Sequence, residues 1–229
     1  MKINAVIVAA GMGSRMKAGK NKVYVDLCGK PVLWHTVKAV ADSGVFDKIV
    51  VVTGYDNIEE CSVLLSEFDI DWTVCIGGDT RQESVKNGLF ACGDCDFVAI
   101  HDGARALVTT DIIKNTVNAA IKYGAAAPGV HPKDTLKLVN GDNIITKTVD
   151  RDNVYAIQTP QVFKYDDIVK GHEIAEADGA AVTDDCMIIE RMGKIVKITE
   201  GSYDNIKLTT PEDMYIANEI LKKRSEESV

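Results

Sequence analysis

The sequence predicts an α/β fold in which a Rossmann-like, mostly parallel sheet carries helices on both faces and a protruding β-arm. Short β-rich apolar runs alternate with amphipathic stretches through the first half of the chain, which is typical of α/β proteins. Residues 5–9 and 49–52 are apolar at every position, as strands covered on both faces are. A hairpin pattern near residue 140 interrupts the alternation and predicts the arm.

Strands and helices alternate in the first half of the predicted fold. The stretch 112–121 keeps helical spacing, with apolar residues at Ile112, Ile113 and Val117. In chain order, the predicted elements are strand 5–9, helix 32–41, strand 49–53, helix 58–68, strand 72–76, helix 84–90, strand 97–100 and helix 112–121. Crossovers between parallel strands are right-handed, so ligands should bind where loops leave the carboxyl ends of these strands.

The alternation stops after Val130. Apolar runs at 136–139 and 144–148 flank a turn of Asn, Gly and Asp residues at 140–143, which is typical of a hairpin. We therefore interpret residues 135–158 as a β-arm within a single domain that spans all 229 residues.

The alternation resumes after the arm. Helices are expected at 165–177 and 185–192, followed by a strand at 196–199 and a final helix that begins at Pro211. Proline is favourable in the first turn of a helix, and Thr210 before it is the expected N-cap.

Composition limits the classes of function. The chain has 26 Lys and Arg residues against 34 Asp and Glu residues, a formal net charge of −8. A negative field repels polyanions, so nucleic acid is not an expected partner, and any phosphate site must be local. We found neither an apolar run of about 18 residues nor a signal-peptide pattern, so we expect no membrane partner and a cytoplasmic location.

The six cysteines are scattered along the chain, and a disulfide framework is not expected in a reducing compartment. Cys92 and Cys95 form a single C-x-x-C motif, whereas a zinc site of this kind needs a second pair at metal-binding distance. Zinc binding and redox activity stay open as alternatives, but buried or surface thiols are the commoner outcome.

The loop after the first strand, AAGMGSRM at residues 9–16, stands where a nucleotide binds in such a sheet. Its small residues let backbone amides approach phosphate, and Arg15 and the later Lys22 supply positive charge. The dinucleotide fingerprint fails because Met16 replaces its third glycine, and no Gly-Lys-Ser/Thr completes a Walker pattern. A surface turn with exposed basic residues is the alternative reading.

This loop and the segments after it resemble the sugar-phosphate nucleotidyltransferases, and in combination the 2-C-methyl-D-erythritol 4-phosphate cytidylyltransferase family. The resemblance extends from Ile3 to Leu221, and its specificity comes from the order and spacing of the segments. The segments are AAGMGSRM (9–16), LCGKPVL (27–33), GGDTRQESV (77–85), HDGAR (101–105), DTLK (134–137), TVDR (148–151), QTPQ (158–161), TDD (183–185) and DNIKLT (204–209).

The resemblance implies attack of a sugar-alcohol phosphate on the α-phosphorus of CTP, with release of pyrophosphate. The attacking oxygen is already ionised, so charge crowding and alignment, rather than proton removal, form the barrier. The matched positions Arg15, Lys22 and Lys207 would be the catalytic cations, although a solvated surface lysine is the alternative for Lys207. Mg²⁺ or another divalent cation would be held mainly by the CTP phosphates. The family commonly has Pro-Lys-Gln here, whereas Asn21 and Val23 flank Lys22.

The resemblance also implies a site for cytosine and ribose, in which hydrogen bonds select CTP over other nucleotides. Asp102 would contact ribose or the sugar alcohol, with metal ligation as its rival role. His101 is disfavoured as a base because the nucleophile needs no deprotonation. In a structural reading, the glycine pair is a turn that leads into a helix at 81–90, and Asp79 or Thr80 caps this helix. The implied nucleotide-binding residues are Ala9, Ala10, Gly11, Gly78, Asp79, Ser84 and Asp102.

The implied substrate-binding residues are Arg105, Thr135, Arg151, Thr159 and Thr183. In this family the arm crosses to a second subunit, so Arg151 would reach the partner's active site and the chain would be a homodimer. An arm that only dimerises is the alternative. Ala106 stands where the family commonly has a proline after the arginine.

The resemblance implies cytidylyl transfer to 2-C-methyl-D-erythritol 4-phosphate in the non-mevalonate isoprenoid pathway, and the residues favour this function over three rivals. Ribitol 5-phosphate cytidylyltransferases share the glycine loop and the QTPQ segment, whereas the DTLK and TVDR segments favour the isoprenoid enzyme. A catalytically silent nucleotide-binding protein is disfavoured because Arg15, Lys22 and Lys207 are all present. A dehydrogenase is disfavoured by the failed fingerprint.

Overall fold

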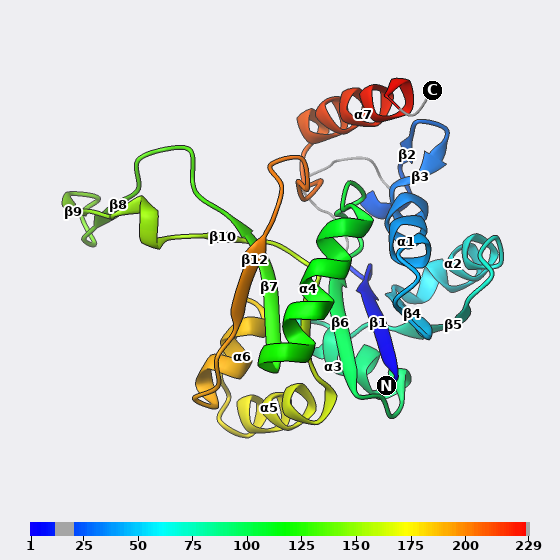
Figure 1. Ribbon diagram of the computed structural model, residues 1–229, viewed down its shortest axis with the longest axis horizontal. Helices are drawn as coiled ribbons and strands as arrows, with labels where there is room; N and C mark the ends of the chain where they lie inside the picture. The colour runs from blue at the N-terminus through cyan, green and yellow to red at the C-terminus, as the bar shows by residue number, and fades with distance from the viewer. Residues whose placement is uncertain (12–20, 228–229) are drawn as a thin grey trace.

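A twisted sheet lies at the centre of the protein in a computed structural model that describes residues 1–11 and 21–227 (Figure 1). Within these ranges the sheet has eight strands, in the order β10-β7-β11-β6-β1-β4-β5, with β12 also paired to β7. The strands are β1 (Ile3–Val8), β4 (Lys48–Thr53), β5 (Asp71–Ile76), β6 (Phe97–Asp102), β7 (Ala125–Val130), β10 (Ala156–Ile157), β11 (Gln161–Lys164) and β12 (Lys197–Glu200).

The pairing confirms a mostly parallel sheet. The strands β1, β4, β5 and β6 pair in parallel, and β12 pairs in parallel with β7. Both β10 and β11 run antiparallel to their neighbours. The four strands predicted from apolar runs in the first half of the chain form the parallel half of the sheet.

Helices cover both faces of the sheet, as predicted, and the side chains of β1 alternate between the two cores that result. Ile3, Ala5 and Ile7 pack with residues of α1, α2 and α4, whereas Val6 packs with residues of α3, α5 and α6. None of the described helices is long and apolar enough to span a membrane. The helices are α1 (Val32–Asp42), α2 (Ile58–Leu65), α3 (Arg81–Cys92), α4 (Thr110–Tyr123), α5 (Tyr165–Ala177), α6 (Asp185–Arg191) and α7 (Pro211–Glu226).

Two helix starts carry hydrogen-bonded capping boxes. The Thr210 hydroxyl accepts from the Asp213 N–H at the start of α7, which confirms the predicted cap before Pro211. At the start of α3, Thr80 and Glu83 form the same motif, so Thr80 rather than Asp79 is the N-cap. The helix begins at Arg81, as expected from the turn before it, and ends at Cys92.

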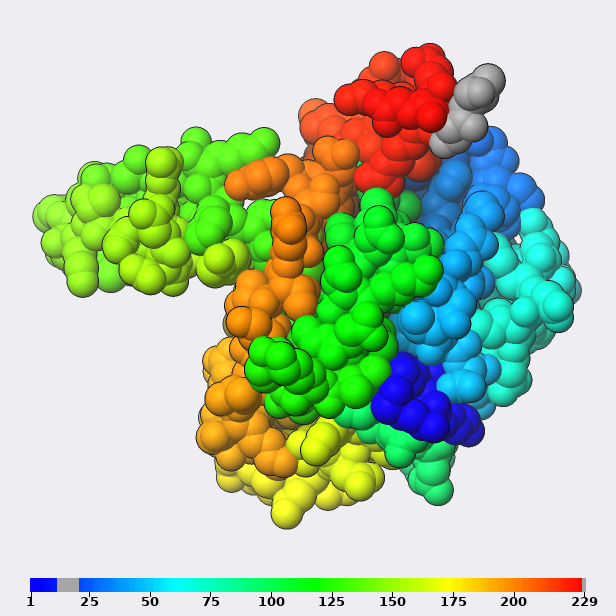
Figure 2. Space-filling model, viewed as in Figure 1, coloured from blue at the N-terminus to red at the C-terminus, as the bar shows by residue number. Residues whose placement is uncertain are grey.

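A hairpin projects from the sheet, formed by β8 (Lys137–Val139) and β9 (Ile145–Thr148). Figure 2 shows it extending to one side, apart from the body of the protein. The hairpin lies within the expected range 135–158, and β10 at the end of this range pairs with β7 in the sheet. Between β9 and β10, Arg151–Asn153 form a short 3-10 helix, η3.

The sequence pattern does not predict three strands of the sheet, which are β7, β11 and the two-residue β10 at the end of the expected arm. β7 has the sequence AAAPGV and β11 is only four residues long, so neither has the β-branched run that marks a strand locally. Both are buried between neighbouring strands, and their state is set by this pairing.

The close contact of α3 with the sheet depends on Gly88. A Cβ at this position would lie 2.4 Å from Val6 Cγ1 and 2.7 Å from Val52 Cγ2. Gly88→Ala should therefore destabilise the fold by roughly 1–3 kcal/mol through overpacking, although alanine is normally the better helix former. The measurement is the midpoint of urea unfolding, with Phe90→Ala in the same helix as control, since Phe90 is 90% exposed. Unchanged or higher stability of Gly88→Ala would contradict this packing.

Candidate active site

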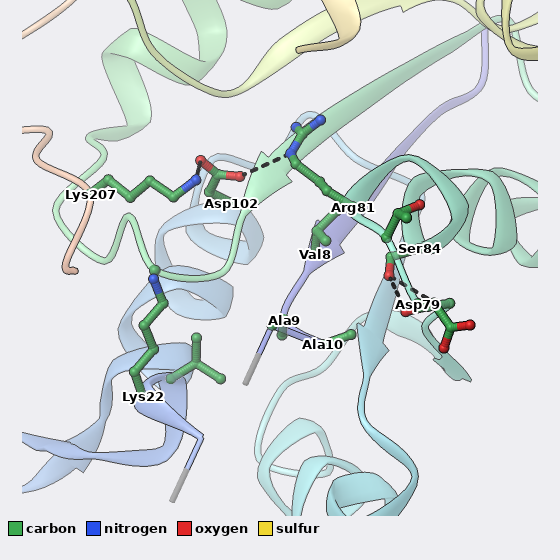
Figure 3. A pocket seen from close by; sticks show the side chains of 14 residues that line it. Val8, Ala9, Ala10, Lys22, Asp79, Arg81, Ser84, Asp102 and Lys207 are labelled. Atoms are coloured by element: carbon green, nitrogen blue, oxygen red, sulfur yellow. Dashed lines mark hydrogen bonds and ion pairs between the residues drawn. The ribbon is translucent and has the colours of Figure 1, made fainter. Parts of the chain in front are cut away.

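A cavity of about 620 Å³ opens at the carboxyl ends of β1 and β6. Figure 3 shows Lys22 and Lys207 entering it from one side and Arg81, Ser84 and Asp79 lying on the other. The residues predicted from the sequence that line it are Ala9, Ala10, Gly11, Lys22, Gly78, Asp79, Ser84, Asp102 and Lys207. Arg15 lies outside the described residues.

The end of β1 and the start of α3 form one wall of the cavity. The Gly78 N–H donates to Ser84 Oγ at 3.1 Å, which ties the glycine pair to the helix. A Cβ on Gly77 would lie 2.4 Å from the Ala10 Cβ, so glycine is needed for the loop to pack against β1. This wall offers backbone groups and one hydroxyl at close range, which suits recognition of a planar base by hydrogen bonds.

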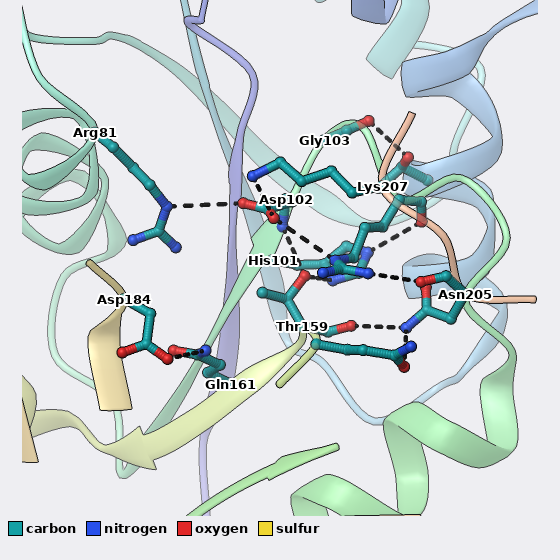
Figure 4. A network of polar contacts seen from close by, with 12 residues as sticks. Arg81, His101, Asp102, Gly103, Thr159, Gln161, Asp184, Asn205 and Lys207 are labelled. Carbon is teal, nitrogen blue, oxygen red and sulfur yellow. Dashed lines mark hydrogen bonds and ion pairs between the residues drawn. The ribbon is translucent and has the colours of Figure 1, made fainter. Parts of the chain in front are cut away.

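Asp102 lies at the opposite wall and forms ion pairs with three cationic side chains (Figure 4). Its Oδ2 lies 2.9 Å from Lys207 Nζ and 3.6 Å from Arg105 Nε, and its Oδ1 lies 3.7 Å from Arg81 Nε. Burial alone would raise the pKa of Asp102, but Lys207, Arg81 and Arg105 outweigh it and lower that pKa to about 2. The carboxylate is therefore ionised at neutral pH.

Buried hydrogen bonds hold the segment that carries Lys207. The Asn205 amide donates to Gln158 Oε1 and to the Thr159 carbonyl, both at 3.1 Å. Arg105 Nη1 donates to the Asn205 carbonyl at 2.6 Å. These bonds fix the backbone two residues before Lys207, so the DNIKLT segment positions a cation at the cavity.

Asn21 anchors the segment that carries Lys22. Its Oδ1 accepts from the Val23 N–H at 3.4 Å and its Nδ2 donates to the Ala9 carbonyl at 2.8 Å. Lys22 is the first residue of the short 3-10 helix η1 (Lys22–Tyr24). Asn21, which stands where the family commonly has proline, thus links the segment of Lys22 to the residue after β1.

His101 points away from the cavity, into the interior. Its Nδ1 lies 2.9 Å from Thr159 Oγ1, which also accepts from the Asp102 N–H at 3.0 Å. Burial lowers the pKa of His101 to about 4. A neutral, enclosed imidazole cannot serve as a base on a substrate in the cavity.

The structure does not bring the five expected substrate-binding residues into the lining of the cavity. Arg105 is buried beside Asp102, and burial lowers its pKa. The Thr159 hydroxyl is engaged by Asp102 and His101. Thr135, Arg151 and Thr183 are exposed elsewhere on the described surface.

Arg81 lines the cavity but was not predicted as a site residue. Its Nη2 donates to Asp185 Oδ2 at 2.7 Å, and Asp185 is fully buried. A sequence signal existed, because Arg81 lies inside the GGDTRQESV segment and Asp185 inside the TDD segment. Their pairing was not visible, since 104 residues separate them.

The arrangement can hold a polyphosphate beside a base. Lys22 and Lys207 supply fixed positive charge, and the glycine wall lies on the other side. The described residues include no group of three or more His, Cys, Asp or Glu side chains able to hold a metal ion.

Comparisons with known proteins agree in one family. The sequence profile of the 2-C-methyl-D-erythritol 4-phosphate cytidylyltransferase family matches residues 3–223. Proteins of that name from Clostridium acetobutylicum and Caldanaerobacter subterraneus are 46% and 47% identical to the chain. The alignments cover 96% and 97% of this chain, and 98% and 100% of the respective relatives.

Solved structures give the same result. The crystal structure of 4-diphosphocytidyl-2C-methyl-D-erythritol synthase from Anaerococcus prevotii matches with a TM-score of 0.89 and 32% identity, over 96% of this chain and 98% of that one. The Thermus thermophilus 2-C-methyl-D-erythritol 4-phosphate cytidylyltransferase matches with a TM-score of 0.79 and 26% identity, over 97% and 100% of the two chains. The chain therefore belongs to the 2-C-methyl-D-erythritol 4-phosphate cytidylyltransferase family.

Proposed function

We propose that the chain transfers the cytidylyl group of CTP to 2-C-methyl-D-erythritol 4-phosphate. The products are 4-diphosphocytidyl-2-C-methyl-D-erythritol and pyrophosphate, in the non-mevalonate isoprenoid pathway. The observation that carries the proposal is a cavity in which Lys22 and Lys207 face a glycine wall at the carboxyl ends of β1 and β6. The names of its relatives specify the nucleotide and the acceptor.

The chemistry needs positive charge rather than a base. The phosphate of the acceptor is an ionised nucleophile, and its approach to the α-phosphorus is opposed by the charge already on the triphosphate. Lys22 and Lys207 lie where they would offset this charge, and the expected third cation is Arg15. The buried His101 is consistent with a reaction that removes no proton from the nucleophile.

A divalent cation, which we propose is Mg²⁺, supplies further charge on the phosphates when the nucleotide is bound. Asp102 lines the cavity, and its oxygens already contact Lys207, Arg105 and Arg81. We therefore assign Asp102 to hydroxyl contacts with ribose or the sugar alcohol rather than to metal ligation.

We also propose that the chain is a single-domain, cytoplasmic homodimer joined through its arm. Leu138, Val139, Ile144 and Ile145 are each more than half exposed on the hairpin. Exposed apolar patches of this kind mark protein interfaces. Arg151 lies in η3 at the base of the hairpin and outside the cavity of its own chain, so a crossing arm would give it access to the partner's site.

CTP should be the preferred nucleotide. Groups of the glycine wall left unpaired by a wrong base cost about 1–3 kcal/mol each, which corresponds to a roughly 5- to 150-fold loss per group. The measurement is pyrophosphate release with CTP, UTP, ATP or GTP, first with 2-C-methyl-D-erythritol 4-phosphate and then with ribitol 5-phosphate as acceptor. Equal turnover of UTP would refute the base site, and faster turnover of ribitol 5-phosphate would refute the proposed acceptor.

The two lysines of the cavity should act on kcat. Lys22→Ala and Lys207→Ala should each lower kcat by roughly 100-fold or more, the scale of one preorganised electrostatic donor, with unchanged circular dichroism. Lys114→Ala on the outer face of α4 is the matched control, since Lys114 is exposed and lies outside the cavity lining. Losses of less than tenfold would place Lys22 and Lys207 on the solvated surface instead.

A shared site should show complementation between inactive chains. Arg151→Ala should stay dimeric but lose activity, whereas Lys147→Ala, an exposed change in the same arm, should keep activity. In a heterodimer of Arg151→Ala with Lys22→Ala, one site carries both defects and the other carries neither. Dissociation and reassociation of the two variants should raise activity toward half of wild type per heterodimer. If exchange is confirmed by mass and the mixture stays inactive, Arg151 serves its own chain.

A further inference from the structure

Arg81 bridges the carboxylates of Asp102 and Asp185 at the inner wall of the cavity. Figure 4 shows its contact with Asp102. It is the first residue of α3, and the capping box of Thr80 and Glu83 fixes the backbone there. Its Nη2 donates to Asp185 Oδ2 at 2.7 Å, and its Nε lies 3.7 Å from Asp102 Oδ1. One guanidinium thus connects the start of α6 to the end of β6.

Asp185 is a rigid anchor for this guanidinium. Gln161 Oε1 accepts from the backbone N–H groups of Asp185 and Cys186, both at 3.1 Å, which holds the first turn of α6 against β11. The Asp185 side chain is 1% exposed, and the His172 ring lies 3.7 Å from its Oδ1. Its backbone and its surroundings are therefore set before any ligand binds.

The Asp185 carboxylate remains charged in this enclosed position. Burial would raise its pKa, but His172 and Arg81 outweigh burial and hold that pKa below the usual range. Among the described residues, Arg81 supplies the hydrogen bond to this carboxylate, and Oδ1 has no hydrogen-bond partner. A buried carboxylate paired in this way orients its partner strongly, because releasing the guanidinium would leave the charge uncompensated.

The contacts of Asp102 divide between its two oxygens. Lys207 and Arg105 both contact Oδ2, whereas Arg81 contacts Oδ1. Rotation about the Cβ–Cγ bond moves both oxygens, so the contacts on Oδ2 and the contact on Oδ1 each restrain it. Among the described residues, Arg81 is the cation that restrains the Oδ1 side of this carboxylate.

We infer that Arg81 and Asp185 form a positioning pair, in which Asp185 holds Arg81 and Arg81 holds the Oδ1 side of the Asp102 carboxylate in place for the ribose of the nucleotide. The role rests on the proposed function, because Asp102 is assigned there to hydroxyl contacts. Asp185 acts through Arg81 and touches no substrate. The two residues should therefore behave as one unit when CTP binds.

A double-mutant cycle in the pyrophosphate assay tests the pair. Arg81→Gln and Asp185→Asn should each lower kcat/KM for CTP by about tenfold or more, mostly through KM. The double variant should have a kcat/KM for CTP within about twofold of that of the less active single variant, because both changes remove the same link. KM for the acceptor should change less than threefold, a split that general unfolding would not produce. Arg81→Lys keeps the charge without the fork and should recover little of the loss.

The exposed pair of Arg191 and Asp178 provides the matched control. It has the same atoms at 2.8 Å, but its side chains are 36% and 54% exposed. Arg191→Gln and Asp178→Asn should leave kcat/KM within about twofold of wild type.

Two kinetic results would overturn the positioning pair. Multiplicative losses in the double variant would mean that Arg81 and Asp185 act independently. An unimpaired Asp185→Asn beside an impaired Arg81→Gln would mean that Arg81 meets the nucleotide without help from Asp185.

A crystal structure of Asp185→Asn without ligand tests the same link apart from activity. The pair predicts a displaced Arg81 guanidinium and a rotated Asp102 carboxylate, and unchanged positions of both would refute it. If the wild-type chain does not use CTP, the proposed function fails, whereas this structure still decides whether Asp185 positions Arg81.

Discussion

The candidate site depends on the ion pairs of the Asp102 carboxylate. Cations from three separate segments meet on it: Arg81 from α3, Arg105 from the loop after β6 and Lys207 from the loop before α7. Without a negative charge between them, these cations would repel one another at such distances. The carboxylate therefore lets positive charge gather at one wall of the cavity, in a chain whose net charge is −8.

The sheet determines where this carboxylate stands. Val8 and Asp102 are partners in the parallel register of β1 and β6, so the end of β6 lies directly beside the loop that begins at Ala9. The antiparallel strand β11 pairs with the other side of β6. Thr159, two residues before β11, accepts a hydrogen bond from the Asp102 N–H. The site thus combines the usual position for ligands in a parallel sheet with supports that come from its antiparallel part.

Such a site is costly to bury and is stabilised by pairing rather than by packing. Asp102 and Asp185 both lose hydration, which raises the free energy of their charged forms, and neighbouring cations offset this loss. Buried ion pairs add little net free energy to folding, and well-packed apolar groups in their place often stabilise a protein equally well. The pairs of Asp102 and Asp185 with their cations are therefore not explained by stability alone. Their value lies in fixed orientation, because hydrogen bonds to Gln161 and Asn205 hold the segments that carry Asp185 and Lys207.

Sequence alone determined the elements whose pattern is local. The helix at 165–177 ends where predicted, the Thr210 cap forms, and the small residues at 9–11 line the cavity. Helical period, caps and small residues act over a few neighbouring positions, so a local pattern reveals them. Tertiary structure alone decided the strand state of the AAAPGV segment, the inward position of the Thr159 hydroxyl and the bond between Arg81 and Asp185. These features depend on partners far away in the chain, and no local preference of a residue encodes which distant group will lie beside it once the sheet has formed.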